Sequence, residues 1–279
     1  MIGDALRQAL VGEVRALFND GAKGERPVER AEHPFTPRGS VAWRVHGDVT
    51  TMMVGGVAAL LMQMLHPSAL AGVWDHSNFR ADMLGRLRRT ARFIAITTFG
   101  EREAALAAID RVRRIHAAVG GERPDGLPYR ADDPALLAWV HVAGAVPFLD
   151  AWKRFGEPMM SAADQDRYFA DVAPVARALG ADQVPVTRAE ALALIAALRP
   201  ELRADPRSRE IARIVLRARP PKLAALPVQS LMMQAAVDLL PGWARAMHGL
   251  RGSALGRPAV DAATFGLAGT LRWAFAGAR

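Results

Sequence analysis

Residues 101–121 read EREAALAAIDRVRRIHAAVGG, a pattern that indicates an α-helix stopped by two glycines. Four of its side chains recur every three or four residues and so share one stripe: Ile109, Val112, His116 and Val119. This stripe should face a core, whereas Arg111 and Arg114 lie off it and can reach solvent. His116 therefore points inward, where a histidine is more often a core residue than a ligand, although neutral imidazole is a common ligand of haem iron.

Helical patterns also dominate the rest of the chain, which is rich in Ala, Leu and Arg. Caps, prolines and glycines predict an amphipathic helix and then a loop over residues 1–40. Loops are expected over 66–81 (with at most a short helix) and 120–133. We expect an all-α fold with a single globular helical domain over residues 41–279. Its expected helices run from after Trp43 to Leu65, over 82–98 and 101–119, over 135–155 with a kink or break at Pro147, from Ser161, from Thr187, and over 207–218, 227–240 and 258–275.

The composition excludes several classes of protein. The 279 residues are 51% hydrophobic and include no cysteine, which rules out a disulfide scaffold, a thiolate-ligated haem and a cysteine-based zinc or iron–sulfur site. The N-terminus lacks the basic start and continuous apolar run of a signal peptide. The longest apolar run, Met52–Leu65, is shorter than the ~20 residues that span a bilayer. We therefore expect a cytoplasmic location and no transmembrane segment.

The net charge of +8 has several explanations. Arginine on solvated faces is the simplest one, and an anionic ligand, an acidic membrane surface or nucleic acid are the alternatives. Nine arginines and four acidic residues fall between Arg80 and Arg114, so +5 of the charge lies in this stretch. This clustering favours an anionic ligand.

A second group of polar side chains lies on the helix expected over residues 82–98. Arg86, Arg89 and Thr90 are spaced i, i+3 and i+4, so two guanidinium groups and a hydroxyl point in one general direction. As a solvated face they would have no special role. As a buried face they would offer fixed donors to an anion, to dioxygen or to haem propionates.

Other histidines are weaker candidates. His141 lies on the helix over 135–155 among small and apolar neighbours, and it is the main rival of His116 as an iron ligand. His66 and His76, with Asp75, fit no metal-ligand spacing and are expected to end or cap helices. The chain has no G-x-G-x-x-G, Walker A, H-E-x-x-H or G-x-S-x-G motif, which weakens nucleotide-binding, zinc-protease and hydrolase interpretations.

Four stretches together resemble the family of the fungal oxygenase MpaB and the bacterial latex-clearing proteins, which are rubber oxygenases. They are LLMQMLHPSALAGVWDHSNFRADMLGRLRRTARFIAITTFG (60–100), VRRIHAAVGG (112–121), YRADDPALLAWVH (129–141) and LPGWARAMHGL (240–250). The resemblance implies a globin-like core with additional helices and a non-covalently bound haem b. It also implies that His116 is the axial ligand of the iron.

The resemblance also assigns the distal side of the haem. The family motif Arg-x-x-Lys-Thr reads Arg86-Leu-Arg-Arg89-Thr90 in this chain, so Arg89 replaces the lysine. Arginine stays protonated and cannot ligate iron, but it can still donate hydrogen bonds. The rubber-oxygenase mechanism therefore does not transfer in detail.

Three functions remain open at this point. The first is a haem-dependent oxygenase with His116 on the iron and Arg86, Arg89 and Thr90 polarising dioxygen, acting on a small hydrophobic, for example isoprenoid-derived, molecule. The second is a haem-binding sensor or carrier without turnover, which uses the same histidine. The third is a basic helical nucleic-acid binder, which we do not expect because no helix-turn-helix signature is present. The oligomeric state and the substrate stay open.

Overall fold

The chain forms α-helices along most of its described length, as its high content of Ala, Leu and Arg predicts. A computed structural model describes residues 2–19, 24–218, 220, 223–253 and 256–276. Its only sheet within these residues has two short strands, so the all-α prediction is confirmed. The elements are α1 (Ile2–Phe18), α2 (Val41–His46), α3 (Val49–Gln63), α4 (Pro67–His76), α5 (Met83–Phe99), α6 (Arg102–Ala117), β1 (Gly120–Glu122), β2 (Pro128–Arg130), α7 (Pro134–Phe155), α8 (Ala162–Leu179), α9 (Arg188–Leu198), η2 (Arg199–Glu201), α10 (Pro206–Leu216), η3 (Leu223–Ala225), α11 (Leu226–Leu239), α12 (Gly242–His248) and α13 (Arg257–Ala276).

Local side-chain caps set many of the helix starts. Asp82 accepts a hydrogen bond from the backbone N–H of Gly85 at 2.8 Å, and α5 begins at Met83, directly after Asp82. The starts predicted at Ser161 and Thr187 are confirmed in the same way, and Asp133 rather than Asp132 caps α7. A cap supplies an acceptor to backbone donors that the helix itself leaves unpaired.

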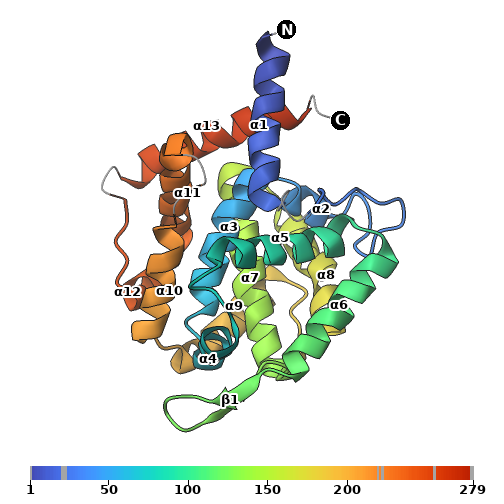
Figure 1. Ribbon diagram of the computed structural model, residues 1–279. Helices are drawn as coiled ribbons and strands as arrows, with labels where there is room; N and C mark the ends of the chain where they lie inside the picture. Colours follow the sequence, from blue (N-terminus) through green and yellow to red (C-terminus); the bar gives the residue numbers. More distant parts are fainter. Residues whose placement is uncertain (1, 20–23, 219, 221–222, 254–255, 277–279) are drawn as a thin grey trace.

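Helices α3 and α7 run side by side through the middle of the fold (Figure 1). A Cβ at Gly55 would lie 2.9 Å from the Cα of Phe148, so glycine is what allows the two helices to come this close. At the other end of the contact, Gln63 donates from its amide to the carbonyl of Val140 at 2.9 Å, and Trp139 donates from its indole to the carbonyl of Gln63 at 3.3 Å. Helix α7 is also long and apolar enough to cross a membrane, but 67% of its most apolar window is buried, as in a core helix.

The other helices surround this central pair. Helices α8 and α9 pack against α7, and α11 and α13 pack against α3 (Figure 1). Helices α5 and α6 meet at the bend of Gly100 and then diverge (Figure 1). A globin-like arrangement of these helices stays a prediction.

The C-terminal helix α13 is tied to the central pair by an ion pair between the half-buried Arg272 and the buried Asp48. The guanidinium of Arg272 donates from Nε to Asp48 at 2.6 Å and from Nη2 to the carbonyl of Phe155 at 2.7 Å. Asp48, at 8% exposure, also caps α3 by accepting from the N–H of Thr51 at 2.9 Å. One carboxylate thus joins the start of α3 to α13 and, through Arg272, to the end of α7.

The predicted loop over residues 120–133 is wrong in part, because it contains a β-hairpin. Gly120 pairs with Arg130 and Gly121 with Tyr129 in an antiparallel register. The hydroxyl of Tyr129 donates to Asp75 on α4 at 2.7 Å. This tertiary contact holds the hairpin, and no local pattern reveals it.

The helix expected to begin after Trp43 and to end near Leu65 is α3, which begins at Val49 after its cap Asp48. The short helix α2 before it was not predicted. Helix α7 does not break at Pro147, since α3 packs against this part of α7. Helix α12 was not predicted.

Candidate functional site

Helix α6 carries His116 in its last turn. Ala105 and Ile109 on the same stripe are buried, and Val112 and His116 are half-buried. The helix ends at Ala117, before the predicted stop, so Val119 lies outside it and the two glycines belong to β1. Arg111 and Arg114 are exposed. The inward orientation predicted for the histidine is therefore confirmed.

The imidazole of His116 is free to act as a ligand. Its Nδ1 atom is buried and has no hydrogen-bond partner among the described residues. Burial lowers the pKa of His116 below the usual value of 6.5, against an opposing effect of the nearby Asp132 carboxylate. A neutral imidazole with an unused nitrogen is the form that binds a metal ion, so this residue fits the role of an iron ligand.

His141, the rival ligand, lies on α7 and is also half-buried. Its Nε2 atom is buried without a hydrogen-bond partner in the described part of the chain. Burial, and then the positive charge of Arg177, lower the pKa of His141 to about 4. Both candidate histidines are thus neutral with a free nitrogen, and geometry alone does not choose between them.

His46, on α2, was missed by the sequence analysis. Its Nδ1 atom shares a hydrogen bond of 2.8 Å with the hydroxyl of Thr98, and its Nε2 atom shares one of 3.0 Å with the hydroxyl of Tyr168. Burial, and then His141, lower the pKa of His46 to about 4. His46 is thus close enough to His141 to interact electrostatically, and its two ring nitrogens are already used.

The three polar residues predicted for the distal side lie close together on α5 but differ in their exposure. Arg86 is half-buried and donates to the hydroxyl of Ser77 at 2.9 Å, and burial lowers the pKa of its guanidinium. Arg89 is exposed and pairs with Asp82 at 3.2 Å. Thr90 is exposed and donates to the carbonyl of Arg86 at 3.2 Å. None of the hydrogen bonds and ion pairs of these three residues reaches His116.

Two other histidines, one at each end of α4, have structural roles. His66 caps α4 by accepting from the N–H of Ser68 at 3.2 Å. His76 lies 3.1 Å from the hydroxyl of Tyr129 in the hairpin. Among the described residues no three His, Asp or Glu side chains are grouped so that they could hold a metal ion.

The buried histidines predict acid sensitivity. The pKa values of His46, His66 and His141 are lowered to about 4, whereas the unfolded chain titrates near 6.5. Between these values the unfolded state binds more protons, so the free energy of unfolding should fall as the pH drops from 6.5, by up to ~1.4 kcal/mol per pH unit for each histidine. Urea titrations between pH 6.5 and 5 measure this slope.

A His46→Gln variant isolates one contribution to that slope. Glutamine retains hydrogen-bonding capacity but does not titrate, so the stability of the variant should depend less steeply on pH than that of the wild type. Equal slopes for the two proteins would mean that His46 is not buried in its neutral form.

Comparison of the chain with known protein families gives a match. The chain matches the family described as "ER-bound oxygenase mpaB/B'/Rubber oxygenase, catalytic domain" over residues 43–273. No curated protein and no solved structure matches it. The matched range includes α5, α6 and α7 in full, and with them every candidate residue described above.

Proposed function

Since the chain belongs to the family of mpaB and rubber oxygenase catalytic domains, we propose that it is a haem-b-dependent oxygenase of a small hydrophobic substrate. The family supports an oxygenase, and hence an oxidoreductase, as the class of enzyme. The haem assignment rests on the free, buried Nδ1 atom of His116 on α6, together with the resemblance of the stretch around His116 to the family.

His116 would hold the iron through a ring nitrogen. Burial keeps the imidazole neutral, so no proton competes with the metal at neutral pH. The aliphatic neighbours Ile109 and Val112 limit the access of water to this side. Haem, when bound, supplies the reactivity toward dioxygen, and the protein supplies ligation, orientation and an apolar surrounding.

Arg86 is the best placed of the distal candidates. Its half-buried guanidinium carries a fixed positive charge, which can orient a propionate or polarise dioxygen. Arg89 stays protonated where the family motif has lysine, so it donates hydrogen bonds and does not bind iron. The hydroxyl of Thr90 is one helical turn from Arg86 and can add a further donor.

A second function, a haem-binding sensor or carrier, is favoured by one observation. Arg89 and Thr90 are exposed, and the guanidinium of Arg89 is paired with Asp82. A polar group that faces solvent cannot stabilise charge in a dry site as strongly as a buried one. The sensor would bind haem through the same His116 without turnover.

Haem reconstitution and product analysis test both functions. The purified chain, titrated with haem b, should develop a Soret band that saturates at one haem per chain. Incubation with short isoprenoid alkenes under dioxygen should then yield oxygenated cleavage products. A Soret band without products would favour the sensor or carrier, and failure to retain haem would overturn both proposals.

A further inference from the structure

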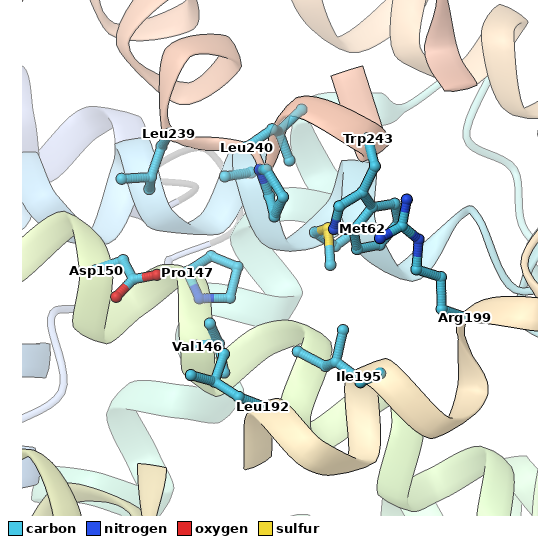
Figure 2. Close-up of a pocket in the computed structure, with 13 residues that line it drawn as sticks. Met62, Val146, Pro147, Asp150, Leu192, Ile195, Arg199, Leu239, Leu240 and Trp243 are labelled. Atoms are coloured by element: carbon cyan, nitrogen blue, oxygen red, sulfur yellow. The ribbon is translucent and has the colours of Figure 1, made fainter. Parts of the chain in front are cut away.

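A cavity that opens to solvent lies beside α7. It has a volume of about 480 Å³ and is lined by residues of α3, α7, α9, the end of α11 and α12 (Figure 2). Its size is typical of sites for small organic molecules. None of the residues predicted for the iron site lines it.

Helix α7 lies between this cavity and the neighbouring histidines His46 and His141. His141 and Phe148 are seven residues apart and lie on one face, where both are close to His46. Val146 and Asp150 line the cavity, and at 100° per residue they point away from the face of His141. The cavity therefore lies away from His141, and it is distinct from the proposed haem site because neither His116 nor Arg86 lines it.

The wall of the cavity is mostly apolar. Side chains of Met62, Val146, Ile195 and Leu240 surround the space from above and below (Figure 2). Met62, Ile195 and Leu240 are at most 7% exposed, so the wall is part of the packed core. An apolar chain in this space would remove its surface from water at little cost to the protein.

The two charged groups that line the cavity lie on opposite sides of it and differ in pairing (Figure 2). Asp150 is paired with Arg188 at 2.8 Å, so its charge is compensated. Arg199 lies at the solvent-exposed edge, with its guanidinium 4.8 Å from the ring centre of Trp243. No carboxylate pairs with Arg199 among the described residues. The net charge offered to a ligand is thus positive and lies at one end of an apolar space.

We propose that this cavity binds a small amphipathic carboxylate, with its apolar chain among Met62, Ile195 and Leu240 and its carboxylate on Arg199. The contact with Trp243 holds the guanidinium in place before the ligand arrives, which lowers the entropy that binding costs. Arginine also suits a carboxylate geometrically, because its planar fork forms two parallel hydrogen bonds. A neutral ligand would gain the apolar contacts alone.

Equilibrium dialysis with dodecanoate and dodecanol tests the proposal, because the two probes share a chain and differ in charge. If the protein can be reconstituted with haem, the haem-loaded form is used, so that the proposed iron site is already filled. Dodecanoate should bind at least about 10-fold more tightly than dodecanol, as expected for one hydrogen-bonded charge. Equal affinities, or no binding of dodecanoate, would overturn the proposal.

Two variants locate the binding. Arg199→Gln should weaken dodecanoate about 10-fold or more and leave dodecanol unchanged, whereas Arg167→Gln, which removes an exposed charge on α8, should change neither. Ala196→Phe fills the cavity from an exposed position, so the variant should fold and lose both ligands. Unchanged dodecanoate binding in Arg199→Gln or Ala196→Phe would place the ligand elsewhere. Haem binding should be normal in all three variants. If the wild-type protein binds no haem, the proposed function fails, but the comparison of dodecanoate with dodecanol can still be made.

Discussion

Replacing His116 with alanine is expected to abolish the Soret band of the haem-reconstituted protein, and replacing His141 with alanine is expected to retain it. Loss of a residue that merely orients a metal ligand weakens metal binding roughly 10–100-fold. Loss of the ligand itself should therefore exceed about 100-fold in haem retention. Titration of each variant with haem b, followed by gel filtration, measures the retained fraction.

A rescue experiment distinguishes ligation from misfolding. His116 is only half-buried, so alanine at this position should leave the urea midpoint close to that of the wild type. Free imidazole should then enter the vacated space and restore the Soret band of His116→Ala. If His141→Ala alone lost the band, and imidazole restored it there, His141 would be the ligand and the assignment made here would be wrong.

Local chemistry made much of the fold predictable. The stripe of Ile109, Val112 and His116 and the caps at Asp82, Ser161 and Thr187 depend on residues within a few positions of one another. The periodicity of a helix and the hydrogen bonds of its first turn act at this range. These predictions were confirmed for that reason.

Contacts between distant segments account for what was missed. The hairpin of residues 120–130 is held by Tyr129 against Asp75. His46 lies on a helix of six residues, too short for a periodic pattern, and its partners Thr98 and Tyr168 are 52 and 122 positions away. The charged edge of the cavity beside α7 is likewise built from segments that are distant in the sequence, so no single stretch of sequence indicates it.

The distal residues illustrate the limit of helical spacing. Arg86 and Thr90 are one turn apart, and the hydroxyl of Thr90 does reach the backbone of Arg86. Spacing predicts direction around the helix axis, but it does not predict how much of each side chain the rest of the protein covers. Asp82, which caps the helix, also pairs with Arg89. Both side chains of this ion pair are largely exposed, so Arg89 lies at the surface, although its spacing was also compatible with a buried polar face.

Replacing Asp48 with alanine is expected to lower the free energy of unfolding by about 2–3 kcal/mol, because the cap and a charged hydrogen bond are lost while Arg272, whose side chain is 34% exposed, is partly rehydrated. The change removes an N-cap of α3, worth about 1 kcal/mol, and leaves the guanidinium of Arg272 without its carboxylate. The side chain of Asp48 is only 6% exposed, so water can replace its carboxylate as a hydrogen-bond acceptor only in part. Urea unfolding followed by circular dichroism measures the difference.

Two further variants test whether the loss of stability in Asp48→Ala comes from the burial of its carboxylate and the helix cap, or from the loss of an ion pair alone. Asp125→Ala breaks a pair with Arg123 of the same 2.6 Å length, but its carboxylate is 55% exposed and caps no helix, so the loss should not exceed about 1 kcal/mol. Asp48→Asn retains an acceptor for the cap and loses the charge, so its loss of stability should be smaller than that of Asp48→Ala. Because Asp48 joins α3 to α13 and, through Arg272, to the end of α7, its removal should weaken the packing of all three helices. A loss in Asp48→Ala no larger than in Asp125→Ala would contradict this role.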